Sequence, residues 1–273
     1  MELGRRTLIM GIVNVTPDSF SGDGQFHGDH IARAVAFARK LRRQGADILD
    51  IGGESTRPGA PRVPLKEELE RVIPVIAKLA PSIDVPISVD TYKPRVAHEA
   101  LQAGASMVNT VQGTPPDKRL LKAVRDHSAG IVLTHIKGTP RSMQKNPYYD
   151  DILKEITAAL QSSVENCLEI GINSDRIIVD PGIGFGKTVD HNLMILNRLE
   201  NLKRLDRPLL VGTSRKSFIG HLLNREVHQR LSGTIATVTA SIFNGAHIVR
   251  VHDVAQVHEA VRMTDAILTE SQN

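Results

Sequence analysis

The stretch HIARAVAFARKLRRQGADILDIGG, residues 30–53, contains one complete structural unit of this chain. Its first part, residues 30–46, places apolar side chains at the spacing typical of an amphipathic helix. Gly45 stands where such a helix would end in a left-handed cap. Residues 47–53 then form a short, nearly continuous apolar run, as in a strand buried on both faces of a parallel sheet. The stretch therefore predicts a helix that leads directly into a buried strand.

The same alternation continues along all 273 residues. Further helical patterns cover 66–80 and 151–171, and Gly104 and Gly171 stand where helices should end. Eight repeats without a large interruption predict a (β/α)8 barrel, a TIM barrel, as a single domain over 1–273, although an open doubly wound sheet shares this alternation. The strand-like runs are 8–14, 47–53, 86–90, 106–110, 130–136, 176–180, 208–213 and 246–253.

Composition limits the functions that the chain can have. The apolar fraction is 41% and the charged fraction 23%, as in globular enzymes. A net charge of +4 fits anionic substrates, but Lys and Arg are interleaved with Asp and Glu, so nucleic-acid binding is not expected. The single Cys167 excludes an intramolecular disulfide and suits a reducing cytoplasm. The N-terminal apolar run is too short for a membrane span.

Polar and glycine-rich residues follow the predicted strands, and in βα barrels the active site lies at these strand ends. Asp90 and Asp180 each end a strand, Asn109 ends another, and Lys216 follows the seventh. Carboxylates, an amide and an ammonium that converge would suit a polar heterocycle with amino and lactam edges. A single strand-end Asp could equally cap the next helix. The full set on one rim favours a ligand site.

Two arginines and a histidine at strand ends are candidate anion binders. Arg57 lies in GGESTRPGA, and Arg250 and His252 lie in VRVHD. A guanidinium matches phosphate oxygens, and alternation along the last strand would place Arg250 and His252 on one face. A salt bridge within the barrel mouth is the alternative for Arg250.

Two glycine- or serine-rich segments lie near the chain's later strand ends. DPGIGFGKT, 180–188, lacks the spacing of a nucleotide-binding P-loop, and its glycines could bring the backbone close to a flat ligand with Phe185 as an aromatic wall. GTSRKSFIG, 212–220, enters a helix whose first N–H groups could hold a carboxylate or phosphate, or which is simply Ser-capped. Asn14, at the first strand end, could take a cation bound by a diphosphate.

Six strings together resemble the signatures of one enzyme family, the dihydropteroate synthases. They are GIVNVTPDSFS, DIGGESTRPGA, SVDTYKP, VDPGIGFGKT, GTSRKSFIG and RVHDV, in the same order as in the family and over almost the whole chain. The resemblance implies a Mg2+-dependent transferase of folate biosynthesis. Such an enzyme joins 7,8-dihydropterin-6-ylmethyl diphosphate to p-aminobenzoate, releases pyrophosphate and forms 7,8-dihydropteroate.

The resemblance also implies a role for each matching residue. Catalysis would depend on Asp90, Asp180, Lys216 and Asp23. The pterin ring would be held by Asp90, Asn109, Asp180, Lys216 and Thr134. The diphosphate would be bound by Asn14, Arg57, Arg250 and His252, with Mg2+ at Asn14. The p-aminobenzoate would be framed by Thr56, Pro58, Phe185 and Ser217.

This chain departs from the common family pattern at three places. The first loop reads SFSGDG where many relatives read SFSDGG, which displaces the acidic residue to Asp23. Thr110 stands where Asp is common, and Thr134 stands where Met commonly lines the pterin, so that wall would be shorter and more polar. The second loop shows no inserted residues of the kind associated with sulfonamide-resistant relatives, which predicts sulfonamide sensitivity.

Two other functions share part of this pattern. A pterin-binding methyltransferase domain would share the barrel and the Asp/Asn set, but Ser217, Arg250 and His252 favour the synthase. A non-catalytic synthase-like chain would be expected to lack Lys216 or Asp180, and both are present. The resemblance further implies a homodimer, and the apolar face of 235–246 could form its interface or could be core.

Overall fold

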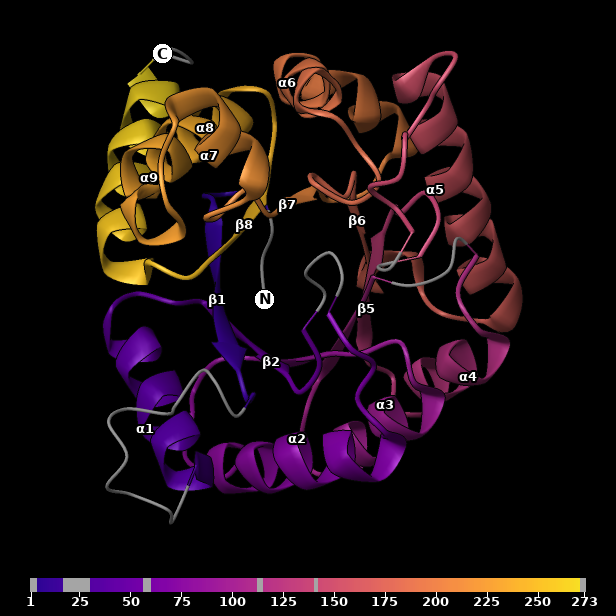
Figure 1. Ribbon diagram of the computed structural model, residues 1–273. Coiled ribbons are helices and arrows are strands. Elements are labelled where there is room, and N and C mark those ends of the chain that lie inside the picture. The colour runs from indigo at the N-terminus through magenta and orange to yellow at the C-terminus, as the bar shows by residue number, and fades with distance from the viewer. Residues whose placement is uncertain (1–3, 17–29, 56–59, 112–114, 140–141, 271–273) are drawn as a thin grey trace.

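The computed structural model describes residues 4–16, 30–55, 60–111, 115–139 and 142–270, and it forms a parallel barrel surrounded by helices (Figure 1). The strands are β1 (Leu8–Asn14), β2 (Ile48–Gly52), β3 (Ile87–Asp90), β4 (Met107–Thr110), β5 (Gly130–Thr134), β6 (Ile177–Asp180), β7 (Leu210–Val211) and β8 (Ile248–Val251). The α-helices are α1 (His30–Arg43), α2 (Leu65–Leu79), α3 (Pro94–Gln102), α4 (Lys118–Asp126), α5 (Ile152–Ile170), α6 (Val189–Asn197), α7 (Ser217–Leu223), α8 (Leu231–Phe243) and α9 (Val254–Glu270).

The order of the strands decides between a barrel and an open sheet. The 8-stranded sheet runs β6-β5-β4-β3-β2-β1-β8-β7, and every pair in it is parallel. A parallel bridge between Val179 of β6 and Leu209, just before β7, joins the two ends of this order. The prediction of a (β/α)8 barrel is therefore confirmed.

The alternation of side chains along the strands produces two apolar cores. Outward-facing residues such as Ile9, Leu49 and Val89 pack beneath the surrounding helices in the larger cluster. Inward-facing residues form a separate cluster inside the ring. Its members are Leu8, Met10, Ile48, Met107, Val132, Ile178, Leu210 and Ile248. These residues fill the barrel interior toward the amino ends of the strands. Among the described residues, the interior therefore opens at the carboxyl ends of the strands.

The helix ends follow from local chemistry. The Asp151 side chain accepts a hydrogen bond from the Lys154 amide at 3.2 Å and so caps the start of α5, whereas Gly171 ends that helix in the left-handed region with φ 94°. Gly45 and Gly104, beyond α1 and α3, have φ 105° and 109°. The predicted glycine stops are therefore confirmed at all three helices.

Several strands are shorter than predicted, most clearly the seventh. The sequence predicts a strand over 208–213, but β7 contains only Leu210 and Val211. Pro208 has no N–H to donate, so it contributes only its carbonyl, which accepts from the Val179 amide at 3.0 Å. The pairing between β6 and β7 is consequently limited to a narrow contact.

Candidate active site

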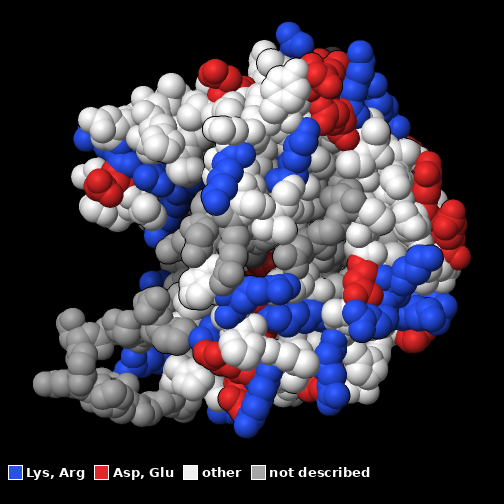
Figure 2. All heavy atoms as spheres, turned by 45° about the vertical axis from the view of Figure 1, so that its right-hand side comes forward, with Lys and Arg blue, Asp and Glu red and all other residues white. Residues whose placement is uncertain are grey.

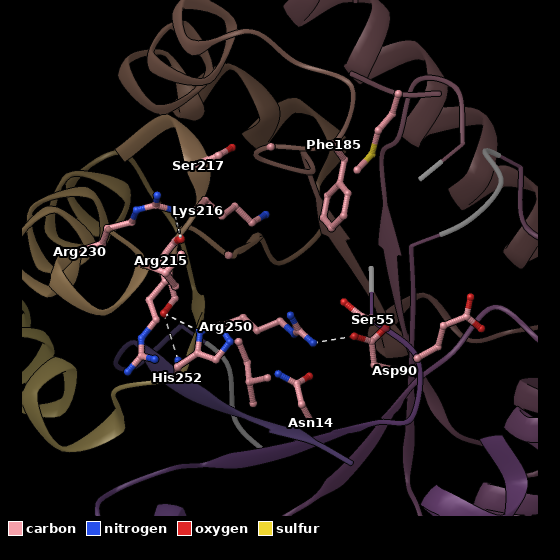
Figure 3. Close-up of a pocket in the computed structure, with 17 residues that line it drawn as sticks. Asn14, Ser55, Asp90, Phe185, Arg215, Lys216, Ser217, Arg230, Arg250 and His252 are labelled. Atoms are coloured by element: carbon pink, nitrogen blue, oxygen red, sulfur yellow. Dashed lines mark hydrogen bonds and ion pairs between the residues drawn. The ribbon is translucent and has the colours of Figure 1, made fainter. Parts of the chain in front are cut away.

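A cavity of about 420 Å³ opens at the carboxyl ends of the strands, as predicted for a βα barrel. Its lining comes from β1, β3, β8 and the segments that follow β2, β5, β6 and β7 (Figure 3). In Figure 2, positively and negatively charged side chains are mixed over the visible face of the molecule, and Lys and Arg side chains border its recessed part. Predicted site residues that line the cavity are Asn14, Asp90, Phe185, Lys216, Ser217, Arg250 and His252.

Arg250 lies between two carboxylates inside the mouth. Its Nε donates to Asp50 Oδ2 at 2.6 Å, and its Nη2 donates to Asp90 Oδ2 at 2.6 Å. The alternative prediction for Arg250, a salt bridge within the barrel mouth, is thus confirmed. The same side chain also lines the cavity. Burial raises the pKa of Asp90 to about 7, even though Arg250 opposes this shift.

Asp50 belongs to this cluster of polar side chains but was not predicted from the sequence. It is fully buried on β2, and its Oδ2 accepts from Asn109 Nδ2 at 3.0 Å as well as from Arg250. A signal was available in the sequence, because Asp50 interrupts an otherwise apolar strand at an inward-facing position. A buried charge at such a position requires a partner. Asp50 therefore joins the Asn109 amide to the Arg250 guanidinium.

Asp180 and Lys216 occupy the opposite side of the mouth. Asp180, at the end of β6, accepts from the Gly182 amide at 2.7 Å, and burial raises its pKa. The Lys216 ammonium donates to the Ile183 carbonyl and lies 4.4 Å from the centre of the Phe185 ring. Burial lowers the pKa of Lys216 to about 8. The pair provides an acceptor and a charged donor within one desolvated region.

Several buried polar atoms near this region have no hydrogen-bond partner among the described residues. Thr134, at the end of β5 and opposite Asp180 in the strand register, is one of them through its Oγ1. Buried polar atoms in native proteins normally have partners. Thr134 Oγ1 and Asn109 Oδ1 are at inward-facing positions at the carboxyl ends of β5 and β4, where a polar ligand could contact them. The others are Asp50 Oδ1, Ser88 Oγ, Asn109 Oδ1 and Thr110 Oγ1.

The side near β7 and β8 carries the predicted anion-binding groups. Ser214 Oγ lies 3.0 Å from His252 Nδ1 and accepts from the His252 amide at 3.1 Å, which fixes the orientation of the imidazole. Ser217 is the first residue of α7. The described helix start has no side-chain cap, so the alternative of an ordinary Ser-capped helix is wrong.

Two of the glycines of DPGIGFGKT have a different role from the one predicted. Gly182 and Gly186 have φ 68° and 66°, and a Cβ on them would lie 1.9 Å from the His135 carbonyl oxygen and 2.5 Å from that of Lys137. At these two glycines the close approach is to the protein's own backbone, whereas Gly184 lies between them and lines the cavity. The buried Lys187 donates to the Phe185 carbonyl at 2.9 Å and so fixes the predicted aromatic wall.

Four predicted site residues, Asp23, Thr56, Arg57 and Pro58, lie outside the described residues. No helix within the described ranges is long and apolar enough to cross a membrane.

Comparison with known proteins identifies the family. A model of the pterin binding enzymes matches residues 10–252, a range that includes the barrel strands from Met10 of β1 to β8 and the cavity mouth. A dihydropteroate synthase from Synechocystis sp. is 46% identical over 267 residues, which covers 97% of this chain and 92% of the relative.

Two solved structures have the same fold at similar identity. The Yersinia pestis dihydropteroate synthase in a sulfonamide drug complex has a TM-score of 0.91 at 42% identity, covering 98% of this chain and 97% of that one. The Xanthomonas albilineans dihydropteroate synthase with 4-aminobenzoic acid has a TM-score of 0.90 at 44% identity, covering 96% and 93%. The chain therefore belongs to the pterin-binding enzymes as a member of the dihydropteroate synthases, which are transferases of folate biosynthesis.

Proposed function

We propose that this enzyme condenses 7,8-dihydropterin-6-ylmethyl diphosphate with p-aminobenzoate and releases pyrophosphate. The observation that carries the proposal is the combination of buried polar groups at the strand ends, Asp90, Asn109 and Asp180, with the cationic and imidazole groups of the cavity that Asp90 also lines, Arg250, His252 and Lys216. The first set suits a pterin ring, and the second suits anionic groups. The 4-aminobenzoic acid complex of the Xanthomonas relative supports the choice of the second substrate.

The pterin ring would lie deepest in the cavity. Asp180 and Asp90 would accept hydrogen bonds from its amino and ring N–H groups, and Asn109 and Lys216 would complete the set, with Thr134 beside them. Because these carboxylates are desolvated, any positive charge that develops on the adjacent methylene carbon would be strongly stabilised by them. Asp90, Asp180 and Lys216 are therefore the residues on which catalysis should depend most, together with Asp23.

The diphosphate would lie against Asn14, Arg250 and His252, with Arg57 from the second loop. A guanidinium has five N–H donors, and Asp50 and Asp90 use two of those on Arg250, so donors remain for a phosphate oxygen. The residues fit Mg2+: Asn14 offers a hard amide oxygen on the cavity wall, and Mg2+ usually binds few protein oxygens when substrate phosphates supply the others. When bound, Mg2+ would neutralise charge on the departing diphosphate.

The p-aminobenzoate would lie nearer the opening, framed by Phe185, Ser217, Thr56 and Pro58. Its carboxylate would meet the amides at the start of α7, where the helix dipole favours an anion. The C–O bond would break first, and its electron pair would leave with the diphosphate. The amine lone pair would then form the new C–N bond to the cationic methylene carbon. The amine nitrogen loses one proton, which restores its neutral charge.

The decisive assay combines the purified enzyme with the pterin diphosphate, Mg2+ and p-aminobenzoate and measures pyrophosphate release. Release should require both substrates, and omission of p-aminobenzoate is the control. We expect Asp180→Asn to lower kcat by about 10²-fold, as for removal of one preorganised electrostatic group. Asp126→Asn, on the surface of α4, should leave kcat unchanged. Full turnover by Asp180→Asn would contradict the role assigned to that carboxylate.

We further propose that the enzyme is a cytoplasmic homodimer. The cytoplasmic location is supported by the single Cys167, since one thiol cannot form the intramolecular disulfides common in secreted proteins. Most of the apolar face of 235–246 is core, since Val238 and Ile242 are buried. The dimer is supported by a set of exposed apolar side chains from α7 to α9, namely Leu222, Leu223, Val227, Phe243, Met263 and Ile267.

A further inference from the structure

Lys93, in the turn after β3, holds both ends of the second loop. This loop comprises residues 52–64. The Lys93 ammonium donates to the carboxylate of Glu54, near its start, and to the Val63 carbonyl at 2.8 Å, near its end. The same ammonium also donates to Glu68 in the first turn of α2. The Lys93 side chain thus contacts Glu54, Val63 and Glu68, of which the first and last are 14 residues apart in the sequence.

Neighbouring residues support the same arrangement. Thr91 Oγ1 donates to Glu68 at 2.6 Å, and the Tyr92 hydroxyl lies 3.2 Å from the Glu54 carboxylate. Arg71 of α2 donates to the Gly53 carbonyl at 2.7 Å. The start of the second loop is consequently held from the turn after β3 and from α2 at the same time.

The charges in this cluster depend on Lys93. Glu68 is 1% exposed and Lys93 is 15% exposed, so both carboxylates share one ammonium that is largely removed from water. Burial opposes the charge on Lys93, but Glu54 and Glu68 outweigh it and raise its pKa. Loss of the ammonium would leave two close carboxylates without a cation.

The cluster lies beside the cavity and not within it. Gly52 pairs with Asp90 in the strand register, and Glu54 and Ser55, just beyond it, line the cavity. Lys93 is not among the residues that line it. Any effect of Lys93 on substrates would therefore act through the position of Glu54 and Ser55.

We propose that Lys93 is a positioning residue, which fixes both ends of the second loop at the cavity opening and thereby sets the affinity for the aromatic amine substrate. This inference rests on the proposed function. Asn109, Asp180 and Lys216 of the pterin-binding set are held by separate contacts from β2 and from the segment after β6. Asp90 is held by Arg250 but is influenced by the charges of Glu54 and Glu68. A variant that keeps the net charge of this cluster should therefore leave the affinity for the pterin ring nearly unchanged.

The test uses four forms of the full-length enzyme: the wild type, Lys93→Met, Lys93→Met with Glu68→Gln, and Lys66→Met. The double variant keeps the net charge of the cluster as in the wild type, so it should fold even where Lys93→Met does not. Lys66→Met is the matched control, because Lys66 lies on α2, is 89% exposed and pairs only loosely with Glu70 at 3.8 Å.

Two measurements separate positioning from a general loss of structure. In the double variant we expect a KM for p-aminobenzoate about tenfold higher. The Kd for 6-hydroxymethyl-7,8-dihydropterin, which lacks the diphosphate that Arg57 would bind, should change by less than about twofold when measured by calorimetry. Amide hydrogen exchange should become faster in the peptide 53–64 and remain unchanged in the peptide that spans β5 and β6.

An unchanged exchange rate in 53–64, an unchanged KM for p-aminobenzoate, or an equal loss of pterin affinity would each overturn the proposal. Failure of the wild type to release pyrophosphate would instead reject the proposed reaction, and the exchange measurement would still decide whether Lys93 holds the loop.

Discussion

At the scale of single residues, Asp50 shows how much of the site depends on groups that would not touch substrate. It accepts from both Asn109 and Arg250, and its side chain is fully buried. Removing one partner of a buried ion pair is costly, because the remaining charge loses its compensation. Asp50 should therefore contribute to stability and to catalysis together.

We expect Asp50→Ala to lower the free energy of unfolding by about 3 kcal/mol, the usual cost of breaking a buried ion pair. Urea unfolding followed by circular dichroism measures this change. Asp84→Ala is the control, because Asp84 is exposed and pairs with Arg42 at the surface, where such pairs contribute little. Equal effects of the two substitutions would show that the Asp50 contacts do not stabilise the fold.

Asp90 should give the enzyme a characteristic pH dependence of stability. Its pKa in the folded protein is about 7, well above the value near 3.9 of an unfolded chain. The folded state therefore holds the proton more tightly. The stability that this proton contributes is fully present below about pH 4 and is lost as the pH rises to about 7.

The prediction is that the wild type loses stability relative to Asp90→Asn as the pH rises between these limits. Asparagine keeps the shape of the side chain but does not titrate. Melting temperatures of both forms across this range, without substrates, provide the measurement. Parallel curves would mean that Asp90 titrates near its ordinary value.

At the scale of elements, α7 depends on a contact with the chain that follows it. Arg230 donates through Nε to the Arg225 carbonyl and through Nη1 to the Arg215 carbonyl, each at 3.0 Å, so it links both ends of α7. A Cβ on Gly220 would lie 2.2 Å from Arg230 Nη2. Alanine at this position would therefore displace the guanidinium end of Arg230 from its present contacts.

Gly220→Ala should lower kcat/KM by about tenfold, because the guanidinium must move and release the segment that carries Lys216. Alanine would otherwise favour the helix by about 1 kcal/mol. In an Arg230→Ala background the same substitution should have no further effect on kcat/KM. Additive losses in the double variant would show that the contact with Arg230 is not the cause.

The order of the helices and strands and the polar residues at the strand ends were largely predictable from the sequence. The side-chain contacts across the barrel were not. Asp90, Asn109 and Asp180 converge because the carboxyl ends of parallel strands meet at one face, which follows from strand order alone. Asp50 and Arg250 are 200 residues apart, and Lys93 meets Glu54 and Glu68 only when β2, β3 and α2 have packed. Such pairs depend on strand register and on the direction of long side chains, which apolar periodicity does not specify.

At the scale of the whole molecule, similarity to a sulfonamide-binding relative extends over nearly the full chain. We expect sulfamethoxazole to inhibit the enzyme competitively with p-aminobenzoate, since Phe185 and Ser217 line the cavity where that substrate would lie. Initial rates at several concentrations of both compounds test this. Activity that sulfamethoxazole does not affect would contradict the prediction.

The exposed apolar side chains of α7 and α9 allow a test of the dimer. Leu222 is 60% exposed and Met263 is 65% exposed. If this surface joins two copies, Leu222→Glu with Met263→Glu should convert the dimer to a monomer, because a charge is costly in an apolar interface. Light scattering after size exclusion measures the mass, and Leu65→Glu on α2, also exposed, is the control.

Because β6 and β7 share only a narrow contact, a bound substrate would affect the flexibility of the barrel there. One bridge, Val179 to Leu209, closes the ring there, and Asp180 and Lys216 lie on opposite sides of that join. Motion of the barrel should be greatest between the two strands that share the fewest backbone hydrogen bonds. A pterin that contacts both residues would connect the two sides of this join. Substrate binding should therefore make the barrel less flexible between β6 and β7.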